Sequence, residues 1–241
     1  MDRSEPTVVL VHGAWADGSS WQRVIPFLLN KGIPVVAVQN PTTSLAEDVA
    51  ATQRALDAIK GSVVLVGHSW GGAVITQAGV DPKVKALVFV AAFAPQVGES
   101  VGDQVGVHGA PPALSRIREE GTNFLRMSVD GFVHDVAQDL PDDEARVLAV
   151  VQAPLAKTTF GEKVTSAAWT ARPNWYVVST EDRAVSVDLQ RELAARMEAK
   201  ITELKASHMS LLSMPEAVAD VILNALAAAT PVRESLATVD L

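Results

Sequence analysis

The chain has 241 residues, of which 48% are hydrophobic, and this composition is typical of a folded domain with a substantial core. A formal net charge of −8 opposes binding to the phosphate backbone of nucleic acid, and the lack of cysteine excludes disulfides and thiolate chemistry. No uncharged apolar run reaches the roughly 18 residues that a membrane span needs, and residues 1–6 lack the apolar region of a secretory signal. We therefore expect a soluble, cytoplasmic protein.

Strand-like and helix-like segments alternate in the first half of the chain. Residues 8–11, 35–38, 63–66 and 86–90 are short, apolar and mostly β-branched, as in parallel strands buried on both faces. Between them, residues 44–60 carry an apolar stripe from Leu45 to Ile59, and Ser44 and Glu47 have the spacing of a capping box. This alternation predicts an α/β fold with a doubly wound, mostly parallel sheet.

The pattern changes in residues 96–170. Glycine and proline interrupt this segment, and short helical stretches are expected around residues 114–127, 131–138 and 142–151. Because no strong strand is evident, we expect a helical cap insertion over the carboxyl ends of the strands. Residues 1–95 and 171–241 then form the core of the fold.

The strand pattern resumes after the predicted cap. Residues 175–180 and 201–204 are expected to be the last two strands, with a helix at 187–200 between them. A final helix is expected to begin at a second capping box, formed by Ser213 and Glu216, and to end near residue 229.

The peptide Gly67-His68-Ser69-Trp70-Gly71 lies between a predicted strand and a predicted helix. A serine hydroxyl is exposed at the top of a sheet only by a strained turn, and flanking glycines allow the backbone to approach closely. The same turn places the amide of Trp70 at a helix N-terminus, where it can stabilise an oxyanion. Ser69 could also be an ordinary helix cap, but the two glycines favour a nucleophile.

A serine nucleophile needs a general base, and that base needs a third group to orient it. His208 follows the last predicted strand and Asp182 follows the strand before it, so both are expected at the same sheet edge as Ser69. We therefore predict that Ser69, His208 and Asp182 are nucleophile, base and acid. Glu181 and then Asp103 are alternative acids, and a surface role is the alternative for His208.

The other four histidines are not expected to be catalytic. His12, at the end of the first strand, is expected to brace its loop and His68 to pack against neighbours, whereas His108 and His134 fall in the cap. No histidine or carboxylate pair has the spacing of metal ligands. We expect neither a metal nor another cofactor.

Several aromatic residues are candidates for an apolar substrate pocket between sheet and cap. They are Trp15, Trp70, Phe93, Phe124, Phe132 and Trp169. A simple core role is the alternative for each of them.

With these residues in place, the chain resembles the α/β-hydrolase superfamily over essentially its whole length. It is most similar to compact bacterial esterases related to plant hydroxynitrile lyases and methyl-ester esterases. Four peptides carry the resemblance, namely residues 11–15 followed by Trp21, residues 67–72, residues 179–183 and residues 207–209. The resemblance implies that the loop after the first strand supplies a second oxyanion amide, which we assign to Ala14.

Two positions favour hydrolysis over cyanohydrin cleavage. The lyases carry a lysine after the catalytic histidine and a threonine after the histidine of the first motif, where this chain has Met209 and Gly13. The dehalogenases and epoxide hydrolases of the superfamily use an aspartate nucleophile, which Ser69 disfavours.

The sequence thus predicts a serine hydrolase that cleaves a small or medium, largely apolar carboxylic ester through an acyl-enzyme. Other chemistry on the same scaffold remains an alternative, such as thioester hydrolysis, C–C cleavage, perhydrolysis or cofactor-free oxygenation. A non-catalytic protein that binds a small molecule is another. We expect no nucleic-acid or membrane partner, and a monomer or homodimer.

Overall fold

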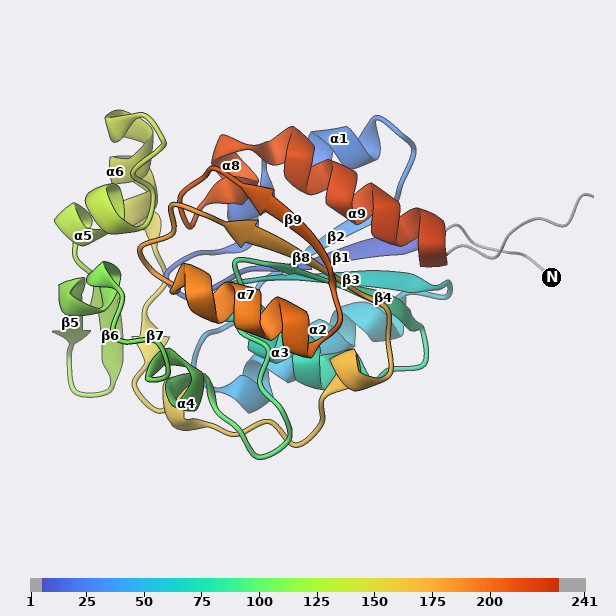
Figure 1. Ribbon diagram of the computed structural model, residues 1–241, viewed down its shortest axis with the longest axis horizontal. Coiled ribbons are helices and arrows are strands. Elements are labelled where there is room, and N and C mark those ends of the chain that lie inside the picture. The colour runs from blue at the N-terminus through green and yellow to red at the C-terminus, as the bar shows by residue number, and fades with distance from the viewer. Residues whose placement is uncertain (1–5, 230–241) are drawn as a thin grey trace, which may run out of the picture.

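The computed structural model describes residues 6–229 and has a six-stranded parallel sheet at its centre (Figure 1). The strand order is β2-β1-β3-β4-β8-β9, and every neighbouring pair is parallel. The predicted doubly wound α/β sheet is thereby confirmed. The strands are β1 (Thr7–Val11), β2 (Val35–Val38), β3 (Val63–His68), β4 (Val84–Val90), β8 (Asn174–Ser179) and β9 (Lys200–Leu204).

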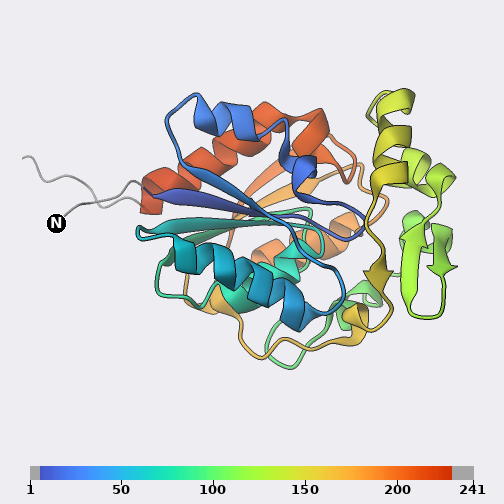
Figure 2. The same cartoon turned by 180° about the vertical axis from the view of Figure 1, so that it is seen from behind.

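Helices cover both faces of this sheet (Figures 1 and 2). One face packs against α1 (Ile25–Leu29), α8 (Ser210–Ser213) and α9 (Pro215–Ala229), and the other against α2 (Leu45–Ala58), α3 (Gly71–Ala78) and α7 (Val187–Arg196). Successive strand residues therefore point into different cores. Val8 and Leu10 pack in the core on the α1, α8 and α9 side, and Val9 and Val11 pack in the core on the α2, α3 and α7 side. Burial on both sides explains why the strands are almost continuously apolar.

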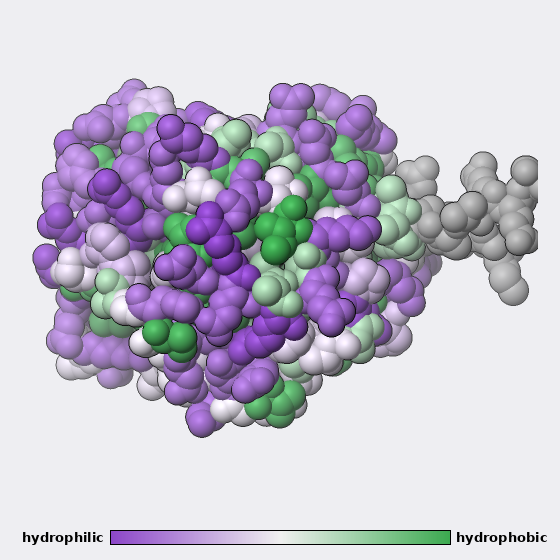
Figure 3. Space-filling view, in the orientation of Figure 1, coloured by the Kyte–Doolittle hydropathy of each residue, from purple (hydrophilic) through white to green (hydrophobic). Residues whose placement is uncertain are grey.

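The surface contrasts with these two cores. The face in Figure 3 is mostly hydrophilic, and its hydrophobic areas are small and bordered by polar residues. None of the helices formed by residues 6–229 is long and apolar enough to cross a membrane.

The strand order fixes where a ligand can bind. The chain starts at β1 inside the sheet, moves out to β2 at the edge, and then crosses back to β3. The loops that follow β1 and β3 therefore diverge from one another, and such a switch point forms a crevice at the carboxyl ends of the strands. A short 3-10 helix, Gly18–Trp21, lies in the connection that leaves β1.

Most of the segment between β4 and β8 lies beyond the carboxyl ends of the strands, at the left of Figure 1, whereas its last turn, Ala168–Thr170, packs against α3 before β8 begins. It contains the helices α4 (Val101–Val105), α5 (Val129–Asp135) and α6 (Asp142–Val151), and 3-10 turns at Pro112–Arg116, Thr159–Gly161 and Ala168–Thr170. We call this segment the cap. Because β4 and β8 are parallel neighbours, the chain leaves the sheet at the carboxyl end of β4 and re-enters it at the amino end of the next strand in the sheet.

The cap is not purely helical, and the predicted helical stretch at 114–127 is wrong. Most of it forms the antiparallel strands β5 (Ile117–Glu120) and β6 (Phe124–Met127), and β7 (Leu155–Ala156) extends this small sheet. Gly121 sits between the first two strands with φ of +61°, a value that favours glycine and allows the chain to reverse. Tertiary pairing thus overrides the helix propensity of Arg, Glu and Leu in this stretch.

Neither predicted capping box forms in full. Ser44 Oγ accepts a hydrogen bond from the Glu47 amide at 3.1 Å, but the Glu47 carboxylate accepts from the Thr43 hydroxyl instead of returning to Ser44. The Ser213 hydroxyl is buried and has no hydrogen-bond partner among residues 6–229, and α9 begins at Pro215. These helix starts therefore rely on single caps and packing.

Candidate active site

Ser69 lies in the turn between β3 and α3 and has a φ of 53°. A Cβ at Gly71 would lie 2.5 Å from the carbonyl oxygen of Val11, and one at Gly67 would lie 2.6 Å from that of Gly71. Both positions therefore require glycine, because the turn packs directly on backbone atoms. The Ser69 amide donates to the Val90 carbonyl at 3.1 Å, which ties the turn to β4.

Backbone strain is concentrated at this edge of the sheet. Among residues 6–229, five non-glycine residues have positive φ, and four of them follow the carboxyl ends of β1 to β4. These four are Trp15, Thr42, Ser69 and Ala91. Each such conformation costs about 1–3 kcal/mol, and strain of this kind gathers at functional sites.

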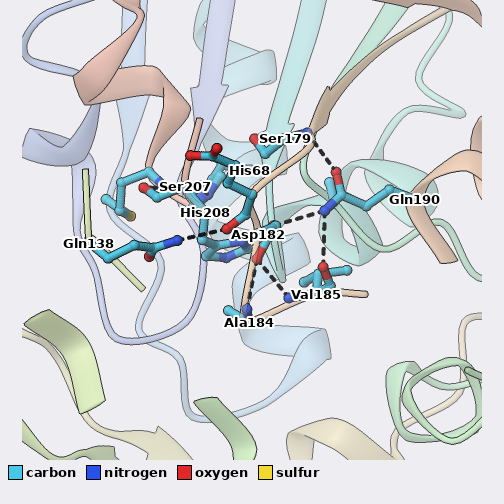
Figure 4. A network of polar contacts seen from close by, with 12 residues as sticks. His68, Gln138, Ser179, Asp182, Ala184, Val185, Gln190, Ser207 and His208 are labelled. Atoms are coloured by element: carbon cyan, nitrogen blue, oxygen red, sulfur yellow. Dashed lines mark hydrogen bonds and ion pairs between the residues drawn. The ribbon is translucent and has the colours of Figure 1, made fainter. Parts of the chain in front are cut away.

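Asp182, in the loop after β8, holds His208 from the loop after β9 (Figure 4). His208 Nδ1 and Gln190 Nε2 donate to Asp182 Oδ2 at 2.7 and 2.8 Å, and the amides of Ala184 and Val185 donate to Oδ1 at 2.7 and 2.9 Å. The Asp182 side chain is fully buried. Four donors satisfy both oxygens of the carboxylate and fix its orientation.

The contact with Asp182 determines which ring nitrogen of neutral His208 carries the proton. Because Nδ1 donates to Asp182, the neutral ring leaves Nε2 free to accept a proton. Ser69 and His208 line the same pocket. In the part of the chain that the structure describes, the Ser69 hydroxyl makes no hydrogen bond, and a nucleophile–base contact of this kind often closes only when substrate is bound.

The alternative acids face elsewhere. The Glu181 carboxylate lies 3.7 Å from Lys205 Nζ. Asp103 accepts from the Ser100 amide at 2.9 Å and completes a capping box at the start of α4. Neither contacts His208.

The two predicted oxyanion donors lie at the same pocket as Ser69. Ala14 belongs to the loop after β1, and Trp70 directly follows the serine. Within residues 6–229, neither amide donates a hydrogen bond. Free amides are rare in a buried site, and these two are available for a ligand oxygen.

The histidines next to this site have structural contacts. His12 Nε2 accepts from the Asn40 amide at 2.9 Å, and Nδ1 donates to the Gly13 carbonyl at 2.8 Å, which braces the loop. His68 Nε2 donates to the His208 carbonyl at 2.9 Å, and the two rings are 4.6 Å apart. Burial lowers the pKa of both His12 and His68, so both rings are neutral near pH 7.

The two cap histidines pair with carboxylates at the surface. His108 Nε2 lies 2.6 Å from Glu192, and His134 Nε2 lies 3.3 Å from Asp130. Over residues 6–229, no three histidine, aspartate or glutamate side chains are grouped so as to hold a metal ion.

The pocket around Ser69 is mostly apolar. Of the predicted aromatic residues, Trp15, Trp70, Phe93 and Phe132 line it. Phe124 and Trp169 do not: Phe124 pairs with β7, and the Trp169 indole donates to the Pro95 carbonyl at 3.0 Å, outside the pocket. Other lining residues were not predicted from the sequence, namely Val105, Leu114, Val136, Phe160, Val185 and Met209.

Polar side chains are few in this lining. They are Ser69, His68 and His208, and no acidic side chain and no lysine or arginine is among them. A ligand that carries a formal charge would find no counter-charge here, so the pocket favours an uncharged ligand.

Comparison with known proteins identifies the family and the fold of the chain. The sequence profile of the alpha/beta hydrolase family matches residues 8–221. The chain is 30% identical to the "Probable hydrolase R7" of Phoma sp., over 91% of this chain and 97% of the relative. It is 25% identical to "Methylesterase 9" of Arabidopsis thaliana, over 90% and 96% of the two chains. The crystal structure of a pyrethroid hydrolase from Sphingobium faniae has the same fold, with a TM-score of 0.80 at 22% identity over 93% and 98% of the two chains.

Proposed function

The chain belongs to the alpha/beta hydrolase family as an enzyme of esterase type, and from this premise we propose that it hydrolyses an uncharged carboxylic ester with Ser69 as nucleophile. The family expected from the sequence is thus confirmed. The observation that carries the proposal is the buried 2.7 Å contact between Asp182 and His208 Nδ1 at a pocket that also contains Ser69.

The arrangement supports acyl transfer in two stages. His208 Nε2 takes the proton of the Ser69 hydroxyl as its oxygen attacks the ester carbonyl, and Asp182 stabilises the imidazolium that forms. The Ala14 and Trp70 amides donate to the oxyanion of the tetrahedral intermediate. His208 then returns the proton to the leaving alcohol, which gives an acyl-enzyme. Water attacks this ester by the same route and releases the acid.

The lining supports a small or medium, apolar substrate. Both the acyl and the alcohol group must lie against aliphatic and aromatic side chains such as Trp15, Phe132 and Phe160. A pocket of this kind binds by burial of apolar surface, with orientation set by a few polar groups. The name of the Arabidopsis relative is that of a methyl-ester enzyme, which supports a carboxylic ester as the bond that is cleaved.

The test is hydrolysis of short and medium p-nitrophenyl esters, together with labelling by a fluorophosphonate. We expect Ser69→Ala to abolish labelling and to lower kcat by up to about 10⁶-fold. The matched control is Ser210→Ala, because Ser210 is also buried and its hydroxyl has no partner among the described residues. The Ser210→Ala variant should keep both ester hydrolysis and fluorophosphonate labelling.

Each other outcome has a definite meaning. Ester turnover that persists in Ser69→Ala would overturn the proposed nucleophile. Labelling of the wild type without turnover of any ester would replace hydrolysis by another reaction of an activated serine. Ligand-induced thermal stabilisation with neither labelling nor turnover would favour a binding protein.

A further inference from the structure

Asp48 is a fully buried carboxylate on α2 that the proposed mechanism does not use. Its Oδ2 accepts from the indole Nε1 of Trp70 at 2.7 Å, and its Oδ1 accepts from the Thr42 amide at 2.8 Å. Among the described residues, no lysine or arginine forms an ion pair with it. A buried carboxylate without a cation costs stability, so its presence at this place calls for a role beyond packing.

The partner of Asp48 is the residue that follows the nucleophile. The Trp70 side chain is buried, and its ring meets the edge of Phe160 at 6.3 Å with an interplanar angle of 84°. The indole is therefore held by a charge-assisted hydrogen bond at Nε1 and by an aromatic contact. Because the Trp70 amide and ring share one Cα, a fixed ring limits rotation of the peptide between Ser69 and Trp70.

We propose that Asp48 is a positioning residue for acyl transfer, holding the Trp70 indole so that the Trp70 amide stays directed at the oxyanion. This inference rests on the proposed function, because it assumes that the Trp70 amide stabilises a tetrahedral intermediate. Asp48 itself touches no reacting atom. Its effect on the reaction passes through the indole hydrogen bond.

The same carboxylate connects the cap to the nucleophile turn. Thr42 has a φ of 56°, its carbonyl accepts from the Ala156 amide at 2.9 Å, and its hydroxyl donates to the Pro154 carbonyl at 2.8 Å. The returning strand of the cap is thus joined through Thr42 and Asp48 to Trp70. One series of hydrogen bonds thus links β7 of the cap to the residue whose amide is the proposed oxyanion donor.

The hydrogen bonds from Thr42 and Trp70 to Asp48 are strongest when the carboxylate is ionised. Each carboxylate oxygen accepts from an N–H group, and a proton on the carboxyl group would remove the charge that strengthens both hydrogen bonds. Burial raises the pKa of Asp48 to about 6, and the nearby Glu162 and Glu47 add to this shift. Near pH 7 the carboxylate is therefore charged and both hydrogen bonds are present.

The test is a double-mutant cycle with Asp48→Asn and Trp70→Phe. Trp70→Phe keeps the backbone amide and the aromatic ring but removes the indole donor. We measure kcat and KM for a p-nitrophenyl ester, per active site as titrated with a fluorophosphonate, so that misfolded protein does not count. The control is Thr52→Val on the same helix, because within the described part of the chain the buried Thr52 hydroxyl donates only to the backbone carbonyl of Asp48, at 3.1 Å.

Each single variant should lower kcat about 5- to 50-fold, a fraction of the about 10²–10³-fold lost with a whole oxyanion donor. KM should change less than about twofold, and the double variant should be no slower than the slower single variant. Thr52→Val should keep the wild-type kcat. The rate of fluorophosphonate labelling should fall in parallel, since phosphonylation uses the same amides.

Losses that multiply in the double variant, or an unchanged kcat per active site in Trp70→Phe, would overturn the inference. The kcat of Trp70→Phe tests the inference even if Asp48→Asn fails to fold. Failure of the proposed function has a different signature: a wild type that shows neither Ser69-dependent turnover nor labelling.

Discussion

Gln190 contacts the acid of the proposed triad from the first half of α7. It is fully buried, its Oε1 accepts from the Ser179 amide at 3.0 Å, and its Nε2 donates to Asp182 Oδ2 at 2.8 Å. The Ser179 contact fixes which end of the side-chain amide faces Asp182. Gln190 therefore orients the carboxylate toward His208 without touching substrate.

We expect Gln190→Met to lower kcat/KM about 10- to 100-fold. The substitution keeps the volume of the side chain but removes a donor to a buried charge, a contact worth about 1.5–3 kcal/mol. The measurement is steady-state ester hydrolysis per titrated active site. The matched control is Gln104→Met, because Gln104 is equally buried but bonds to Ala94 and Glu99 in the cap. Equal losses in the two variants would show that Gln190 has no special role.

The sequence predicts some of these residues and hides others. Ser69 is marked by its two glycines, and Asp182 and His208 are marked by their positions after strands. Gln190 and Asp48 carry no such mark. An acidic residue in the first turn of a helix, like Asp48, is ordinarily explained by the helix dipole. Only the folded chain reveals that it points inward at Trp70.

The loop between α5 and α6 joins the cap to the two loops that carry Asp182 and His208. Gln138 Nε2 donates to the Glu181 carbonyl at 2.7 Å, next to Asp182, and Asp139 Oδ2 accepts from the Ser207 amide at 2.7 Å, next to His208. Figure 4 shows Gln138 and Ser207 beside the Asp182–His208 pair. Through this one loop, the cap contacts the residues that directly precede the proposed acid and the proposed base.

We expect Asp139→Ala to loosen the loop that carries His208. Loss of one hydrogen bond worth about 1 kcal/mol should raise local hydrogen exchange of the Ser207 amide about fivefold. The measurement is hydrogen exchange of the peptide around residue 207, together with kcat. Asp143→Ala is the control in the same cap, because Asp143 is exposed and its side chain accepts, among the residues that the structure describes, only from the adjacent Glu144 amide. Exchange that is equal in wild type and Asp139→Ala would contradict this role.

Elements of the core were easier to predict than elements of the cap. The buried parallel strands are recognisable because both of their faces need β-branched apolar residues, and predicted and observed bounds differ by at most two residues. The β5–β6 hairpin has no such signal, since Arg118, Glu119 and Glu120 are exposed and favour helix in isolation. Its pairing also depends on Leu155, some 30 residues further along the chain.

At the scale of the whole molecule, Asp48 couples stability to pH. Its pKa is raised from a usual value of 3.8 to about 6 by burial, so the folded state binds this proton more tightly than the unfolded state. The resulting contribution to stability is fully present below pH 3.8 and is lost as the pH rises through 6. Ionisation of Asp48 therefore lowers the free energy of unfolding at neutral pH.

We therefore expect the difference in unfolding free energy between wild type and Asp48→Asn to depend on pH. Between pH 7 and pH 4, the wild type should gain up to about 3 kcal/mol relative to the variant, because two pKa units correspond to about that energy. Urea unfolding of both proteins across this range measures it. A difference that is constant with pH would mean that Asp48 has an ordinary pKa in the folded protein.

The adjacency of β4 and β8 bears on how such enzymes can diversify. Because the chain leaves and re-enters the sheet at neighbouring strands, a whole cap can be exchanged between relatives through two junctions without changing the strand order. A chimera built in this way would inherit a new lining for the pocket and, with it, a new set of supports for the loops that carry Asp182 and His208. Successful recombination therefore demands that the incoming cap match the host at Glu181 and Ser207, as Gln138 and Asp139 do in this chain.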